Sequence, residues 1–398
     1  MSKVQPARRP RGSLVGRSRT GPVARWFWDI DKVLLVLVAV LISIGLIAVA
    51  AASPAAAQRY SGGAHNVAPL YYFYRQLLWI ALAVPVMIGV SMLGHPTARR
   101  LSILGAAVCT ALLFLVPIFG VEVNGATRWL DAGFTLFQPS EFLKPLFIVT
   151  VAWLLSMKDK DNSLPVVPLT AVLTGVVALL LMRQPNLGET VIFLGAWVLL
   201  VALSGASMRI LYGLAAAAVA LVVLAYLFYD VATQRINGFL FAEGDQYQVE
   251  SALRTLTAGG LFGAGPGAGL RKFQLPEPHT DYIFSVIGEE FGIIACVAIA
   301  VLYMTIVVRV LVRLLNEEDK FLVLATAGLV AQFGLQALIN MAVNVHIAPS
   351  KGMTLPFISY GGSSMIALAL GFGLLLAFTR KNPHLQNSPY VVTRRAFR

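Results

Sequence analysis

One aspartate in this sequence is well placed to take part in proton chemistry. Asp281 follows two prolines that break regular structure and opens a long apolar segment, within LPEPHTDYIFSVIGEEFG (275–292). Ionisable side chains are costly inside a membrane segment, so each one there suggests a function by default. A carboxylate in such a place can accept a proton from a substrate. Asp281 is therefore a candidate functional residue.

The residues that follow Asp281 predict how it is positioned. Thr280 can cap a helix that begins near Asp281. On that helix Asp281, Ser285 and Glu289 fall at i, i+4 and i+8, which places them on one face. Glu289 and Glu290 have an alternative explanation, because they can pair with basic residues on neighbouring helices.

A second polar segment, EVNGATRWLDAGFTLFQPSEFLKP (122–145), contains three charged candidates. Ser140 can cap a helix starting with Glu141, and Glu141 and Lys144 can form an i,i+3 ion pair. Arg128 lies beside a tryptophan. Its planar guanidinium suits phosphate, although a basic side chain that reaches to the membrane interface is an equal alternative.

A third polar segment, HIAPSKGMTLPFISYGGSS (346–364), lies between two apolar runs. Irregular backbone at membrane depth is tolerated where it lines a cavity. We expect His346 to be a hydrogen-bonded structural residue. Lys351 either holds a phosphate or marks the membrane interface.

The composition explains where these segments must lie. The 398 residues are 58% hydrophobic and 13% charged, far more apolar than a water-soluble fold needs. Because the apolar runs are continuous rather than alternating, membrane-spanning helices are favoured over a barrel. The net charge of +12 does not indicate nucleic acid, since many basic residues lie at the chain ends and in short loops.

Two other features have structural explanations. The glycine-rich run GAGPGAG (263–269) lacks the Lys-Ser/Thr of a phosphate-binding loop, so a flexible or tightly turning loop is favoured. Cys109 and Cys296 each lie in an apolar run without metal-ligand or redox spacing.

The sequence predicts an all-α polytopic membrane protein with about ten spans, of which the fifth and sixth are the least clearly separated. The predicted spans lie near 33–55, 76–94, 101–119, 141–157, 166–182, 187–205, 208–229, 282–310, 321–345 and 363–379.

Basic residues then predict the orientation of these spans. Most of the 31 Lys and Arg fall inside if both termini are cytoplasmic. The outward segments are then 120–140, a large loop at 230–281 between the seventh and eighth spans, and 346–362. The predicted organisation is a basic, disordered cytoplasmic tail (1–32) without a cleavable signal peptide, a membrane domain (33–380) and a cytoplasmic C-terminal tail (381–398).

The three polar segments together resemble the SEDS (shape, elongation, division, sporulation) family. KGMTLPFISYGGSS (351–364), NGATRWLDAGFTLFQPSEFLK (124–144) and PEPHTDYIFSVIGEEFG (276–292) are each similar to a signature of that family. The predicted layout agrees, so the resemblance covers nearly the whole membrane region. Lys351 and Thr354 are similar to the division form of the family rather than to the elongation form.

The resemblance implies a peptidoglycan glycosyltransferase that polymerises lipid II into glycan strands. It implies Asp281 as the catalytic residue of an inverting transfer, acting as general base on the acceptor sugar hydroxyl. Substrate-binding positions follow from the same match, less firmly for some of them: Arg128, Glu141, Lys144, Arg235, Gln248, His279, Lys351 and Ser359.

The resemblance also implies the setting of this activity. The expected partners are lipid II, a class B penicillin-binding protein as transpeptidase, and other membrane proteins of the division machinery. The expected location is the bacterial inner membrane at the septum, with the active site facing the periplasm. No cofactor is required by the sequence, although a divalent cation could bridge Asp281 and the diphosphate.

Two other functions remain open on the sequence. A lipid II flippase would use the same lipid and charged residues but no catalytic base. A non-catalytic scaffold would only recruit the penicillin-binding protein.

Overall fold

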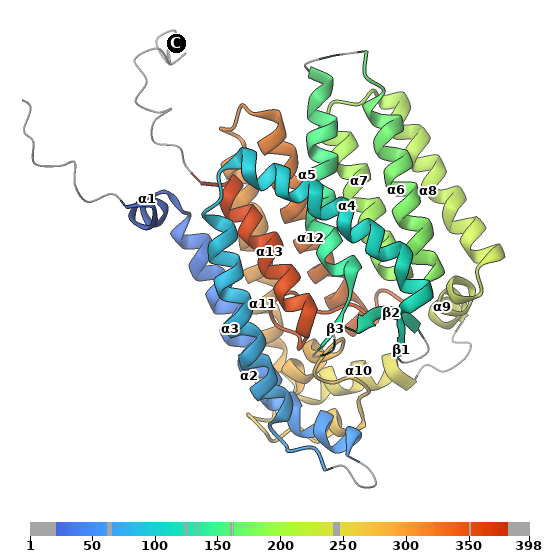
Figure 1. Cartoon of the computed structure of the whole chain (residues 1–398). Coiled ribbons are helices and arrows are strands. Elements are labelled where there is room, and N and C mark those ends of the chain that lie inside the picture. The colour runs from blue at the N-terminus through green and yellow to red at the C-terminus, as the bar shows by residue number, and fades with distance from the viewer. Residues whose placement is uncertain are drawn as a thin grey trace, which may run out of the picture.

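The structure, a computed structural model, describes residues 21–61, 66–123, 126–131, 133, 135–159, 161, 163–241, 247–349 and 352–380 (Figure 1). These residues are mostly helical, and the prediction of an all-α polytopic membrane protein is confirmed. Long helices form because every backbone N–H and C=O must find a partner within its own segment in lipid.

Among the described residues, eight helices are long and apolar enough to cross a membrane. They are α2 (Lys32–Tyr60), α3 (Tyr71–Ser91), α4 (His95–Phe119), α5 (Pro139–Ser156, extended by the 3-10 turn η1, Met157–Asp159), α6 (Val166–Arg183), α8 (Met208–Phe228), α11 (Ile283–Leu314) and α12 (Lys320–Asn344). Two shorter apolar helices, α7 (Leu187–Leu203) and α13 (Gly362–Phe378), coincide with the remaining predicted spans. The number of crossings stays a prediction.

The middle of the bundle is formed by α5, α12 and α13 (Figure 1). In the most apolar stretch of each helix, 72% of the residues of α5 and 67% of those of α12 are buried. In contrast, α8 has no buried residue and lies at the edge of the bundle (Figure 1). The central helices are therefore the rigid part on which a site can be built.

The end of the bundle opposite α1 (Pro22–Asp29) contains the irregular structure (Figure 1). A small antiparallel sheet connects α4 to α5 in the order β1 (Val121–Val123), β2 (Ala126–Asp131), β3 (Leu136–Phe137). The predicted loop 230–281 contains α9 (Asp230–Phe241), α10 (Tyr247–Ala258) and the 3-10 turn η2 (Arg271–Gln274).

The two chain ends differ from the prediction in one respect. Residues 22–29 of the predicted disordered tail form the helix α1. The end of α13 lies at the same end of the bundle as α1, which agrees with both termini on one side (Figure 1). Residues 1–20 and 381–398 lie outside the described residues.

A break in α11 anchors the glycine-rich loop. Gly292 has φ +80°, and a Cβ there would lie 2.3 Å from the carbonyl oxygen of Leu261. The amides that follow the break, of Ile293 and Ile294, donate to the carbonyls of Gly260 and Leu261. Only glycine allows this backbone conformation and this close approach. The loop therefore turns tightly against α11, which is the second of the two predicted alternatives.

Candidate active site

Asp281 lies in a turn immediately before α11, not on the helix. The helix begins at Ile283, and the hydroxyl of Thr280 donates to Glu277 Oε2 (3.0 Å) rather than to a backbone amide of α11. The predicted cap by Thr280 is therefore wrong, and so is the shared helical face of Asp281, Ser285 and Glu289.

Two asparagines of α12 explain why the turn does not continue as helix. Asn340 Nδ2 and Asn344 Nδ2 both donate to the carbonyl oxygen of Asp281, at 2.9 and 3.1 Å. Asn344 Oδ1 accepts from the amide and the hydroxyl of Ser285, at 3.1 and 2.7 Å. Both asparagines are buried, so these bonds leave few alternatives for the backbone. They fix the position of Asp281 on the rigid centre of the bundle.

The third polar segment packs directly against this turn. Ser359 Oγ donates to the carbonyl of Thr280 (2.7 Å) and accepts from the amide of Leu355 (2.7 Å). The amide of Tyr360 donates to the carbonyl of His279 (2.8 Å). A Cβ at Gly352 would lie 3.3 Å from Asp281 Oδ2. The segment before α13 thus forms one wall beside the Asp281 carboxylate.

Two arginines from other elements act on the same carboxylate. Arg128 comes from β2 and Arg235 from α9, and both are half-buried. Arg128 is held by bonds from Nε to the carbonyl of Gln184 (3.1 Å) and from Nη2 to that of Pro185 (2.5 Å). Burial lowers the pKa of both arginines, while the nearby Asp281 opposes that change.

Burial dominates the protonation of Asp281. It raises the pKa of this half-buried carboxyl to about 7, and Glu277 adds to the rise while Arg128 and Arg235 oppose it. A helix N-terminus stabilises a carboxylate and would lower this pKa, whereas burial acts in the opposite direction. A carboxyl that titrates near neutral pH is suited to accept a proton.

Glu141 and Lys144 form the predicted ion pair, and a third charged residue joins them. Lys144 Nζ lies 2.8 Å from Glu141 Oε1 and 3.7 Å from Glu189 Oε1 on α7. All three side chains are buried. Helix α5 begins at Pro139, so the predicted cap by Ser140 is wrong. Glu189 also acts electrostatically on Arg128, which links this cluster to the arginines beside Asp281.

The other predicted site residues have different surroundings. His279 is buried between Tyr72 and Tyr360, with ring centroids at 4.2 and 5.2 Å, and burial lowers its pKa to about 4. Gln248 is exposed on α10, 3.5 Å from the hydroxyl of Tyr282. Lys351 lies outside the described residues. The catalytic role of Asp281 and the substrate-binding roles of all the other predicted site residues stay predictions.

The two glutamates of α11 bind the loop that precedes them. Glu289 accepts from the amides of Arg271 and Lys272, at 2.6 and 2.9 Å. Glu290 pairs with the buried Lys272 and accepts from the amide of Gly267 (3.0 Å). Their role is structural, although their partners are on η2 and the glycine-rich loop rather than on neighbouring helices.

Sequence reasoning missed Asn340, Asn344 and Glu189. All three are polar residues inside apolar segments, and that was a readable signal. Within the described residues, no group of three or more His, Cys, Asp and Glu side chains converges on a metal site. A cation at Asp281 would need diphosphate oxygens as further ligands, a combination that Mg²⁺ accepts.

Comparison with known proteins shows the family of this chain. A model of the cell cycle protein family matches residues 31–384. The probable peptidoglycan glycosyltransferase FtsW of Caulobacter vibrioides is 39% identical over 361 residues, covering 90% of this chain and 91% of that protein. The corresponding protein of Nitrosomonas europaea is 32% identical, covering 89% and 94%.

The chain belongs to the SEDS family. Solved structures of SEDS proteins have the same fold. A chain of a peptidoglycan synthase complex that coordinates polymerization and crosslinking aligns with a TM-score of 0.71 at 26% identity, covering 88% of this chain and 97% of that one. The rod shape determining protein RodA of Thermus thermophilus aligns with a TM-score of 0.65 at 27% identity, covering 88% and 96%.

Proposed function

We propose that this chain is a peptidoglycan glycosyltransferase that polymerises lipid II on the outer side of the inner membrane. One observation carries the proposal: the half-buried carboxyl of Asp281 is fixed by α12 and lies under the influence of Arg128 and Arg235. The relatives from Caulobacter vibrioides and Nitrosomonas europaea, both probable peptidoglycan glycosyltransferases, support the same activity.

The reaction joins two lipid-linked sugars by one displacement. Asp281 takes the proton of the acceptor hydroxyl, and that oxygen forms a bond to the anomeric carbon of the donor. The bond from this carbon to the diphosphate breaks, and the lipid diphosphate leaves with the electron pair. Attack from the opposite face converts the α-linked donor into a β-linked product, so a single base suffices.

The arginines are suited to the leaving group. Negative charge develops on the diphosphate as its bond breaks, and fixed donors in a partly buried place stabilise it better than water does. Arg128 has its orientation set by two backbone carbonyls, so it needs little reorganisation. Arg235 and Lys351 are further candidates for the diphosphate, and a divalent cation is possible without being needed for any step above.

The remaining candidates either support the site or lie where the substrate would contact them. Glu141 and Lys144 form a buried cluster with Glu189 that acts on Arg128, and we assign them to maintaining its charge environment. Ser359 holds the backbone of the Asp281 turn. Gln248 and His279 lie on α10 and next to the turn, where contact with the sugar or peptide part of lipid II would occur.

The setting of the activity follows the relatives. We propose a role in septal wall synthesis with a class B penicillin-binding protein, which would crosslink the strands, and with other division proteins. A SEDS fold within a peptidoglycan synthase complex supports such pairing.

Two assays on one preparation test the proposal. The purified chain with its class B partner is given lipid II, and glycan formation and lipid II translocation in vesicles are both measured. We expect glycan from wild type. Translocation without glycan would favour a flippase, and neither activity in an intact complex would favour a scaffold.

A further inference from the structure

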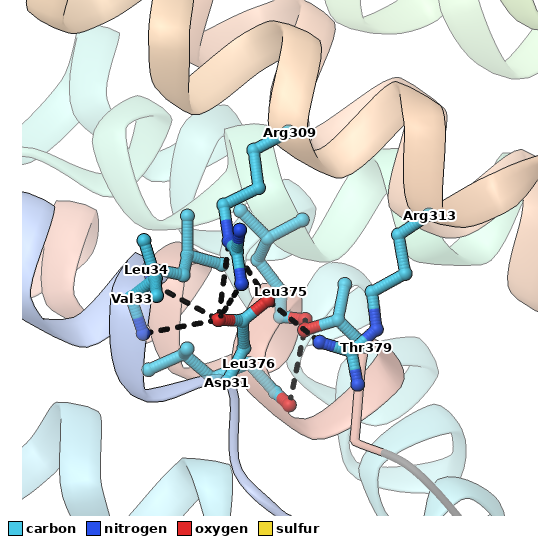
Figure 2. Close-up of polar contacts among 8 residues, drawn as sticks. All are labelled: Asp31, Val33, Leu34, Arg309, Arg313, Leu375, Leu376 and Thr379. Carbon is cyan, nitrogen blue, oxygen red and sulfur yellow. Dashed lines mark hydrogen bonds and ion pairs between the residues drawn. The ribbon is translucent and has the colours of Figure 1, made fainter.

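An ion-pair cluster joins α2 and α11 at the end of the bundle opposite Asp281. Asp31, just before α2, faces Arg309 and Arg313, which lie one turn apart on α11 (Figure 2). Arg309 Nη2 lies 2.8 Å from Asp31 Oδ1, and Arg313 Nη1 lies 2.6 Å from Oδ2. Asp31 Oδ1 also accepts from the amides of Val33 and Leu34, both at 3.1 Å.

The cluster of Asp31, Arg309 and Arg313 has an excess positive charge on the side that is exposed to the surroundings. Burial would raise the pKa of Asp31, but the hydrogen bond from Arg309 and the amide of Leu34 hold it below its ordinary value, so the group is a carboxylate. One carboxylate faces two guanidinium groups. The side chain of Asp31 is 4% exposed, whereas those of Arg309 and Arg313 are 38% and 22% exposed. The arginines can therefore reach a second anion.

A groove of about 680 Å³ begins at this cluster and follows α11. Its polar end contains the two arginines, Asp31 and Asn316. Its wall contains exposed apolar side chains of α11: Val301, Met304, Val308 and Val312. From Val301 to Val312 the helix rises about 16 Å. A charged head and an apolar wall of this length match the two parts of a phospholipid.

Helix α1 indicates how deep in the membrane the cluster of Asp31, Arg309 and Arg313 lies. Trp26 Nε1 donates to Ser91 Oγ of α3 (2.8 Å), which fixes α1 against the bundle. Phe27 and Trp28 are exposed, and Lys32 Nζ lies 4.6 and 4.5 Å from their ring centroids. Aromatic side chains of this kind lie at headgroup level in membranes. Asp31 follows α1 directly, so the arginines lie at the same level.

We propose that this groove binds an anionic phospholipid of the inner leaflet. The phosphate lies on the free side of Arg309 and Arg313, and one acyl chain lies along Val301, Met304 and Val308 toward the middle of the membrane. The site is separate from the proposed glycosyltransferase site and does not depend on it. A free phosphate would leave the apolar wall without a function, and the net charge disfavours a zwitterionic lipid.

The test measures lipids retained by the full-length protein. Wild type in detergent is mixed with phosphatidylglycerol or phosphatidylcholine of equal chain length, and bound lipids are counted by native mass spectrometry. We expect phosphatidylglycerol to bind about fivefold more tightly than phosphatidylcholine, because the two arginines and one aspartate leave one uncompensated positive charge near the headgroups. Glycerol 3-phosphate is added to separate the two sources of a phosphate: it should not displace the lipid.

Two groove variants and two controls complete the test. Val308→Trp fills the groove and leaves the ion pairs intact, and Arg313→Gln removes the charge excess. Both should bind the two lipids equally. Val297→Trp, on the same helix outside the groove lining, and Arg209→Gln, an exposed basic residue on α8, should keep the preference.

Three results would overturn the proposal. They are equal binding of both lipids by wild type, an unchanged preference in Val308→Trp, and displacement of the lipid by glycerol 3-phosphate. Loss of the preference in Val297→Trp would also count against it. Val308→Trp alone decides the matter if Arg313→Gln does not fold.

Discussion

The amide of Asn340 donates to the carbonyl oxygen of Asp281 over 2.9 Å, and the same nitrogen donates to the carbonyl of Met353 over 2.6 Å. One buried side chain on α12 therefore joins the turn that carries the carboxyl to the segment leading to α13. Asn344 adds a second bond to the Asp281 carbonyl. The position of the proposed base depends on α12, far from it in the sequence.

Asn340→Ala should reduce the turnover number of polymerisation more than it changes KM. The variant removes the donor to the Met353 carbonyl and leaves the Asp281 carbonyl with Asn344 alone. A shift of about 1 Å at a reacting group can cost about 100-fold in rate. The measurement is steady-state polymerisation with lipid II. Gln274→Ala, an exposed side chain in the same outer segment, should behave as wild type. An unchanged turnover number in a folded Asn340→Ala protein would refute the positioning role.

The polymerisation rate should rise with pH through about 7. Burial raises the pKa of Asp281 to about 7, and a general base works only when deprotonated. Because Glu277 contributes to this rise, Glu277→Gln should move the midpoint to lower pH. Initial rates between pH 5.5 and 9 measure it. Glu250→Gln, an exposed glutamate on α10, should leave the midpoint in place. A midpoint that does not move in Glu277→Gln contradicts this electrostatic account.

Asp281→Asn should raise the melting temperature at pH 8. The folded-state pKa of Asp281 is about 7, above its ordinary 3.8, so the folded protein binds this proton more tightly than the unfolded chain. Stability is then lost as pH rises from about 4 to about 7, and the asparagine avoids that loss. The difference in melting temperature between Asp281→Asn and wild type should shrink toward pH 5. Thermal unfolding in detergent at both pH values measures it, and a wild type more stable than the variant at pH 8 would contradict it.

Glu290→Gln should destabilise the fold by about 3–5 kcal/mol, because it leaves Lys272 as an unpaired buried charge. Adding Lys272→Met should recover part of this loss. The matched control is the exposed pair Glu250 and Arg254, where the same two changes should cost less than about 1 kcal/mol. Thermal unfolding of the single and the double variant at each pair measures the loss of stability relative to wild type. Equal effects at both pairs would show that Lys272 is not buried as described.

Much of the fold is predictable because lipid leaves the backbone few choices. The continuous apolar runs predicted the long helices. The fifth and sixth predicted spans, which were the least clearly separated, are two helices, because α6 ends at Arg183 and α7 begins at Leu187. Short strands were not foreseen, since residues 121–137 offer no long alternating pattern. The cap at Thr280 failed because hydrogen bonds from α12, distant in sequence, hold the Asp281 carbonyl.

The candidate site was predictable only in part. Asp281 was predictable because it is a charged residue at the start of an apolar segment. The family resemblance then implied Arg128 and Arg235. No local pattern says that β2, α9 and the turn before α11 meet, because that depends on how the helices pack. Asn340 and Asn344 were readable as polar residues inside an apolar segment, but their partners were not.

The most direct test of the central claim is glycan formation from lipid II by the purified chain with its class B partner, comparing wild type with Asp281→Asn. Asp230→Asn, an exposed aspartate in the same outer segment, is the matched control. The account predicts that Asp281→Asn, folded and bound to the partner, loses at least about 100-fold in rate, while Asp230→Asn does not. Glycan formation by Asp281→Asn near the wild-type rate would contradict it.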